Sequence, residues 1–259
     1  MRIAVGVEYK GTSFSGWQSQ HGTRTVQDCV ELALGRVADH PLRVITAGRT
    51  DTGVHATGQV VHFDSESVRP EHSWVRGANS NLPSDVRILW ARPVPDSFHA
   101  RFGAVERAYR YVIFSSGIRP AVLGELCAWT YYDLDVRPMR QAAESLLGEH
   151  DFSAFRAAGC QAKSPRRTIR RISLQQSGPW LWLDITADAF LQHMVRNIVG
   201  SLLPVGRGER PPEWLAEVLQ GADRTRAGMT APPQGLYLTA VRYPQHYQLP
   251  EPAPAVRFW

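Results

Sequence analysis

Strand patterns and helix patterns alternate along this 259-residue chain in two similar series, and this order limits the folds open to it. Apolar residues two apart predict strands, and apolar residues three to four apart predict helices. The first series has strands at 2–9, 42–48, 57–64, 86–94 and 106–114, and helices from Thr25 and over 69–79. The second has a helix after Asp135, strands at 168–176 and 180–187, helices over 190–202 and from Pro211, and a last strand at 236–243. Single helices between strands and hairpins predict an α+β fold with a mixed, mostly antiparallel sheet.

The repeat of this order divides the chain near residue 115. We predict an N-terminal half over 1–114 and a C-terminal half over 115–243. The last segment, 244–259, is rich in proline and is expected to be an irregular surface tail. A chain of this length buries a substantial core, as one large domain or two small ones.

The sequence has neither a membrane segment nor a cysteine framework. No run approaches the roughly 18 apolar residues of a membrane span, and the N-terminus enters a strand pattern directly instead of a signal peptide. Cys29, Cys127 and Cys160 lie far apart, without a C-x-x-C pair. We therefore expect a soluble, cytoplasmic protein without a disulfide framework or a thiolate metal site.

Polar chemistry is concentrated in residues 48–56, which read GRTDTGVHA between two predicted strands. This turn holds Arg49, Asp51 and His55 where the flanking strands can aim their side chains. Asp51 follows an arginine by two residues, an arrangement that can keep a carboxylate ionised and directed at a substrate.

The positive charge is almost entirely arginine. The formal net charge is +5, and Lys10 and Lys163 are the only lysines. Arginine offers planar, bidentate contacts to phosphate, although a codon bias would also explain the composition. Local clustering points more clearly to a polyanion, because five cationic residues lead into one predicted strand. They are Lys163, Arg166, Arg167, Arg170 and Arg171.

Three further features suit nucleotide binding, and each has a structural alternative. The segment 9–18 is aromatic and rich in glycine, which suits either flat nucleobases or a well-packed loop. Tyr109 and Tyr111 share one face of a predicted strand, where an aromatic ring can stack on a substrate or fill the core. Arg196 interrupts an apolar helix and therefore requires an anionic partner, either a protein group or a phosphate.

Seven segments together resemble the TruA-type tRNA pseudouridine synthases, in order and in spacing. They are YKGTSFSGWQ at 9–18, RTVQ at 24–27, GRTDTGVHA at 48–56, FHARFGAVERAYRY at 98–111, HDFSAFR at 150–156, FLQHMVRNIVG at 190–200 and PQGLYL at 233–238. The resemblance implies two ferredoxin-like (RRM-like) halves, joined into one sheet with a central cleft and with helices on the outer face. It also implies a homodimer that binds tRNA.

The same resemblance implies an isomerase that converts uridines 38–40 of the anticodon stem-loop to pseudouridine, without cofactor or metal. Asp51 corresponds to the catalytic aspartate, acting on a flipped-out uridine. Whether it attacks the base, attacks the ribose or assists elimination stays open. Tyr109 would stack on the uracil, Arg196 would pair with the carboxylate and Arg49 would hold the extruded nucleotide, while Leu236 would form an apolar wall.

Two other functions are considered. A non-catalytic tRNA-binding or chaperone protein could use the same scaffold, although the presence of Asp51, Arg49, Tyr109 and Arg196 together argues against it. A metal-dependent hydrolase could use His55, His62 and Asp51, but typical ligand spacings and a third convergent ligand are absent from the sequence.

Overall fold

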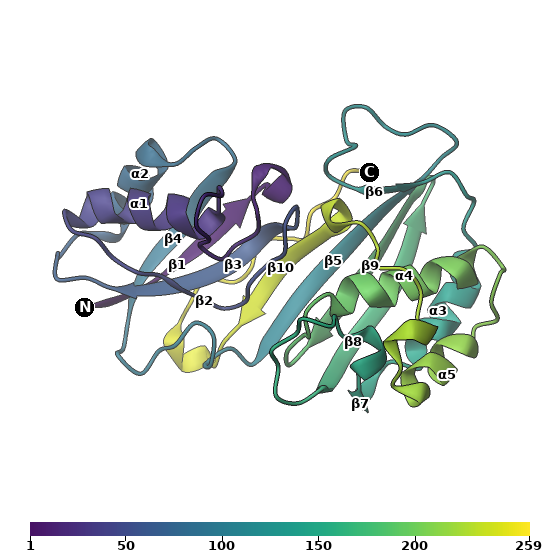
Figure 1. Ribbon diagram of the computed structural model, residues 1–259. Coiled ribbons are helices and arrows are strands. Elements are labelled where there is room, and N and C mark those ends of the chain that lie inside the picture. The colour runs from purple at the N-terminus through teal and green to yellow at the C-terminus, as the bar shows by residue number, and fades with distance from the viewer. The chain divides into compact units, whose positions relative to one another are not determined.

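The computed structural model describes all residues from Met1 to Trp259, and the chain forms two compact units (Figure 1). Unit 1 comprises Met1–Val105 and Tyr237–Val256. Unit 2 comprises Glu106–Leu236 and Arg257–Trp259. The predicted domain boundaries, which give 1–114, 115–243 and 244–259, remain a prediction. No helix has the length and apolar character needed to cross a membrane.

Unit 1 is a sheet with two helices on it. The strand order is β4 (Val86–Val94), β1 (Arg2–Tyr9), β3 (His55–Asp64) and β10 (Leu236–Arg242), and the two-residue β2 (Ile45–Thr46) also pairs with β3. The pairs β1–β3, β1–β4 and β2–β3 are antiparallel, whereas β10 runs parallel to β3. Pairing with β3 explains why the last strand returns to the first unit.

Local sequence fixes both ends of α1 (Val26–Ala38). Thr25, where the sequence predicts the start of this helix, caps its N-terminus by accepting a hydrogen bond from the Asp28 amide. Asp39 ends the helix in the left-handed conformation, with φ of 60°. The second helix, α2 (Glu71–Asn81), lies beside α1 (Figure 1) and buries Trp74 edge-on against Phe63 of β3, with ring centroids 5.1 Å apart. The core of unit 1 therefore lies between these helices and the sheet.

Unit 2 has the same kind of construction. Its strand order is β5 (Glu106–Ser115), β9 (Trp180–Ala187), β8 (Arg166–Ser177) and β7 (Gly148–Asp151), all antiparallel, with β6 (Ala128–Thr130) parallel to β5. The helices α3 (Val136–Glu144), α4 (Met194–Gly206) and α5 (Trp214–Gly221) lie together (Figure 1). Asp135 caps α3 by accepting from the Arg137 amide.

The predicted α+β class with mixed, mostly antiparallel pairing is confirmed. Two short strands, β6 and β7, were not predicted, because three or four residues carry too little alternation to be read. The predicted strand at 42–48 is reduced to β2, since most of that segment leads into a turn. Residues after Gln248 form no helix or strand, but Trp259 stacks on Trp182 of β9 with ring centroids 4.0 Å apart. This stacking joins the last residues to unit 2.

Candidate active site and RNA-contacting residues

Asp51 lies in unit 1 on the turn between β2 and β3, which we call the aspartate turn (residues 47–54). The turn is closed by a hydrogen bond of 3.1 Å from the Val54 amide to the Asp51 carbonyl. Gly53 supplies the positive φ of 78° that the reversal requires. Asp51 is half-buried and Arg49 is exposed, so the turn presents both side chains at the surface of the unit.

Buried polar side chains hold the backbone of this turn from the sheet side. Gln59 of β3, which is 0 % exposed, donates to the Gly48 carbonyl at 2.7 Å. The Tyr9 hydroxyl lies 2.7 Å from Thr50 Oγ1. Burial raises the pKa of Tyr9 to about 12, so this phenol stays neutral and keeps its proton for hydrogen bonding. Gly48 and Thr50, on either side of Arg49, are therefore fixed by groups that are buried away from water.

The glycine-rich loop packs directly on the aspartate turn. The Trp17 amide donates to the Thr50 carbonyl at 3.0 Å, and Gly16 has a φ of 91°. A Cβ at Gly16 would lie 2.8 Å from the Thr50 carbonyl oxygen and 3.2 Å from the Asp51 carbonyl carbon. Phe14 and Trp17 are buried. Of the two interpretations of residues 9–18, the structure shows the packed loop, with its aromatic rings in the core.

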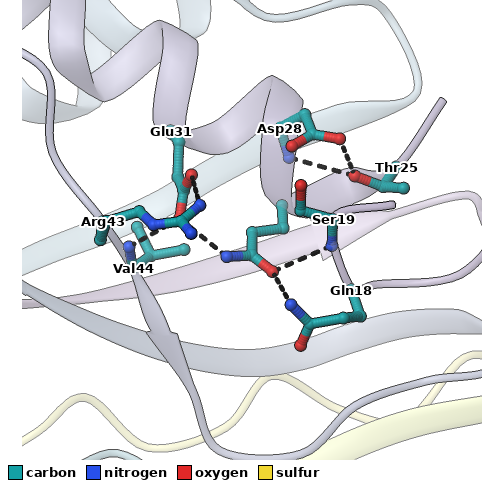
Figure 2. Close-up of polar contacts among 8 residues, drawn as sticks. Gln18, Ser19, Thr25, Asp28, Glu31, Arg43 and Val44 are labelled. Carbon is teal, nitrogen blue, oxygen red and sulfur yellow. Dashed lines mark hydrogen bonds and ion pairs between the residues drawn. The ribbon is translucent and has the colours of Figure 1, made fainter. Parts of the chain in front are cut away.

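A polar network around Gln27 of α1 braces the segments that lead to the turn (Figure 2). The Gln27 amide oxygen accepts from Gln18 Nε2 at 2.9 Å and from the Ser19 amide at 3.1 Å. Its amide nitrogen donates to Glu31 at 2.8 Å, and Glu31 in turn accepts from the Val44 amide at 3.0 Å. The helix α1 therefore holds both the loop at Gln18 and Ser19 and the segment at Val44 that leads into the aspartate turn.

The two histidines considered as metal ligands are engaged by the backbone. His55 Nδ1 accepts from the Gly11 amide at 3.0 Å, and its ring stacks on Tyr237 with centroids 4.7 Å apart. His62 Nδ1 accepts from the Ala100 amide at 3.1 Å. Burial lowers the pKa of His62 to about 4. No group of three or more His, Cys, Asp or Glu side chains is placed to hold a metal ion.

In unit 2, Tyr109 and Arg196 lie on the same side of the sheet. Tyr109 of β5 is half-buried and meets Phe190 edge-on, with ring centroids 5.0 Å apart. Tyr111 shares its face, is fully buried and donates to the Pro232 carbonyl at 2.7 Å. Burial raises the pKa of Tyr111 far above its ordinary value, while the nearby Arg196 charge opposes that rise. Of the two tyrosines, Tyr111 fills the core and Tyr109 stays accessible.

Arg196 and Leu236 are positioned by the segment that precedes β10. Arg196 Nε donates to the Ala231 carbonyl at 2.8 Å, and the Ala231 amide donates back to the Arg196 carbonyl at 3.1 Å. Leu236 is buried and follows Gly235, where a Cβ would lie 2.7 Å from the Val112 carbonyl oxygen. Arg196 of α4 is therefore bound to the segment 231–236, which also carries Leu236.

The strand β8 carries four of the five predicted RNA-binding cations, and Lys163 is exposed just before it. A β-bulge between Ile169 and Arg171 places Arg171 opposite Thr186. Thr186 also pairs with Ala108, whereas Ile185 pairs with Tyr109. Because opposite residues share a face and neighbours alternate, Arg171 and Tyr109 lie on opposite faces of this sheet.

Carboxylates accompany these arginines. Arg171 donates to Glu106 at 3.0 Å, and Arg170 lies 3.9 Å from the same carboxylate. Arg166 lies 3.5 Å from Glu149, and Arg167 donates to the Ser164 carbonyl at 3.0 Å. The cations form a surface strip whose charge is partly balanced within the protein.

Sequence reasoning missed Gln59 and Glu106, which are both buried polar residues in strands. A buried glutamine or glutamate requires a specific partner, so each marks a place where other groups are held. In the sequence, nothing in the spacing of Gln59 and Glu106 distinguishes them from polar strand residues that face solvent, so their burial could not be predicted.

The sequence matches the family described as "tRNA pseudouridine synthase" over residues 6–103 and 142–244. The chain belongs to the tRNA pseudouridine synthase family. A protein named tRNA pseudouridine synthase A from Nitrosococcus oceani is 54% identical over 259 residues, covering 100% of both chains. Its namesake from Thiobacillus denitrificans is 55% identical over 251 residues, covering 97% of this chain and 96% of its own.

Another relative of that name, from Pseudomonas aeruginosa, is 53% identical over 251 residues, covering 96% of this chain and 88% of its own. Among solved structures, a chain of a Cbf5-Nop10-Gar1 complex covers 91% of this chain and 57% of its own, with 9% identity and a TM-score of 0.36, too weak a likeness to support a conclusion. The family match includes Asp51 and Arg196, and the full-length relatives extend across Tyr109. Family membership identifies the chain as an isomerase that acts on uridine in tRNA.

Proposed function

We propose that this enzyme isomerises uridines 38–40 in the anticodon stem-loop of tRNA, with Asp51 as the catalytic carboxylate. The fixed aspartate turn carries this proposal. Breaking the N1–C1′ bond and forming the C5–C1′ bond requires a group that adds to the nucleotide and later leaves, or one that assists elimination, and a carboxylate can do either. The buried contacts of Gly48 and Thr50 restrict where Asp51 can point.

Other residues take supporting roles in the proposal. Tyr109, accessible at the surface of its sheet, stacks on the flipped-out uracil. Arg196 pairs with the Asp51 carboxylate, and Arg49 holds the extruded nucleotide through its phosphate. Leu236 forms an apolar wall of the base pocket. No cofactor or metal takes part, and the working form is a homodimer.

The cationic strip supports tRNA binding in this proposal. It consists of Lys163, Arg166, Arg167, Arg170 and Arg171. Contacts from arginine to backbone phosphates position the RNA without reading its sequence, which suits an enzyme that serves more than one uridine. Raising the salt concentration should therefore weaken tRNA binding steeply.

The deciding experiment compares wild type with Asp51→Asn on an unmodified tRNA transcript, with pseudouridine mapped by carbodiimide modification and primer extension. We expect Asp51→Asn to lose about a thousandfold or more in rate while tRNA binding is kept. Asp39→Asn is the matched control, because it removes the same charge from an exposed helix end whose left-handed backbone tolerates asparagine.

Equal product from wild type and Asp51→Asn would refute the role of Asp51. No pseudouridine from wild type, with tRNA still bound, would instead favour the non-catalytic tRNA-binding protein. Full activity after exhaustive chelation is expected, and loss of activity restored by a metal would contradict the metal-free mechanism. Light scattering tests the homodimer.

A further inference from the structure

A buried carboxylate holds two arginines on the face of unit 2 opposite Tyr109. Glu106, the first residue of β5, is 8 % exposed. Its Oε1 accepts from Arg171 at 3.0 Å, and its Oε2 lies 3.9 Å from Arg170. The two guanidinium-bearing side chains are 67% and 49% exposed, respectively. The cations therefore face solvent while their shared anion lies beneath them.

The bulge in β8 creates this arrangement. It inserts one residue between Ile169 and Arg171, so two consecutive arginines meet a single position of β9. On this face, Thr186 of β9 lies between Arg171 of β8 and Ala108 of β5, which is two residues after Glu106. These small side chains leave room for long arginines to reach across β9 to the carboxylate.

The cluster has one net positive charge, since two guanidinium groups surround one carboxylate. Each guanidinium has five N–H donors, and the contacts with Glu106 occupy a minority of them. The remaining donors can bind an oxyanion, and arginine prefers planar, bidentate contact with phosphate. One phosphodiester group would complete an alternating set of two cations and two anions.

We propose that Arg170 and Arg171 bind one backbone phosphate of the RNA, and that Glu106 limits the charge of this site so that it does not hold other polyanions indiscriminately. The proposal rests on the proposed function, because the ligand is the tRNA backbone. The site lies on the face opposite Tyr109, so the phosphate belongs to a part of the RNA other than the target nucleotide. Glu106 is thus a specificity-determining residue that need not touch the substrate.

The test measures binding of unmodified tRNA and of a short DNA duplex across a series of salt concentrations, for wild type and Glu106→Gln. Glutamine keeps the shape and one acceptor oxygen but removes the charge, which leaves two uncompensated arginines. We expect duplex affinity to rise by about threefold or more, and the slope of log affinity against log salt to steepen by about one unit. The preference for tRNA over the duplex should fall.

Further variants keep the test decisive. The triple variant with Glu106→Gln is measured beside the double variant Arg170→Gln/Arg171→Gln, because the double variant alone leaves the buried Glu106 charge uncompensated. The slope of the double variant should flatten by up to about two units, and adding Glu106→Gln to it should change nothing more. Glu144→Gln removes the charge of an exposed residue of α3 that has no part in the cationic strip, and is the matched control for a general change in charge.

Unchanged slope and preference in Glu106→Gln would overturn the proposal, as would an equal effect of Glu144→Gln. An unchanged slope in the double arginine variant would also overturn it. These outcomes are separate from the proposed function: if wild type modifies tRNA but the Glu106 variant behaves as wild type, only the phosphate site fails. If wild type neither prefers nor modifies tRNA, the proposed function fails.

Discussion

The aspartate turn and the arginine strand β8 hold their functional groups in different ways. Around the turn, buried groups bind the backbone itself: Gln59 contacts Gly48, Tyr9 contacts Thr50, and the loop at Gly16 lies against Asp51. Along β8, exposed arginines are held by the exposed carboxylate of Glu149 and the buried carboxylate of Glu106. The turn is therefore built to fix a position, whereas the strand is built to supply charge.

The difference follows from what each group must do. A carboxylate that acts on one nucleotide atom must be placed within a fraction of an ångström. A cation that attracts a backbone phosphate acts over a longer distance and tolerates movement. Changes at the turn should therefore affect turnover strongly, and changes along β8 should have small effects on stability.

The largest effect is expected from Gly16→Ala. The new Cβ would lie 2.8 Å from the Thr50 carbonyl oxygen, at a φ of 91° that alanine disfavours, so the turn must shift. We expect a loss of turnover of about a hundredfold, together with a destabilisation of roughly 1–3 kcal/mol. Gly22→Ala is the control, because it has a similar φ of 75° but meets nothing within 4 Å. Equal loss of turnover in both variants would show that contact with the turn is irrelevant.

Acid should destabilise unit 1 through the buried His62. The arginines of β8 stay protonated at every working pH and contribute no such pH dependence. The His62 pKa of about 4 lies below the ordinary histidine value of 6.5, so the unfolded chain binds the proton first as pH falls. The contribution of His62 is complete above pH 6.5 and is lost progressively as pH falls to about 4, amounting to about 3 kcal/mol.

Chemical denaturation of wild type and His62→Gln at pH 7 and pH 4 measures this difference. The loss of stability with acid should be smaller in the variant by about that amount. His72→Gln, which changes an exposed histidine of α2, should keep the full dependence. The same acid dependence in all three proteins would exclude His62 as its source.

Tyr9→Phe should have an intermediate effect. It removes the hydroxyl beside Thr50 and leaves that buried group without its partner, at a cost of about 1–2 kcal/mol in unfolding free energy. Turnover should also fall, because Thr50 precedes Asp51. Tyr243→Phe removes a hydroxyl that donates to the Ala100 carbonyl at 2.7 Å, and should cost stability without loss of turnover. If the two variants lose turnover alike, the Tyr9 contact does not position Asp51.

The smallest effect is expected from Glu149→Gln. The Glu149 and Arg166 side chains are 62% and 66% exposed, so solvent screens their attraction. The change in unfolding free energy should be less than about 0.5 kcal/mol. A loss as large as that of Tyr9→Phe would show that the surface strip is structural, and would remove the contrast with the turn.

Several features could be predicted because their causes are local. The helix starts at Thr25 and Asp135 and the strands β1, β4 and β9 follow from residues a few positions apart. The contacts of Gln59 could not be predicted, because its partner Gly48 depends on how the turn folds back onto β3. The aromatic segment 9–18 was open to two interpretations, since the sequence does not show whether a ring meets solvent or core.

The sequence by itself determined the order of the elements, the family, and Asp51 as the candidate carboxylate, because these depend on local patterns and on motifs in register. Only the tertiary structure decided which way the arginines face. In a regular strand Arg171 would share the face of Ile169, which pairs with Ala187. The bulge moves Arg171 to the other face, opposite to that of Tyr109, because one extra residue reverses the alternation of every side chain that follows.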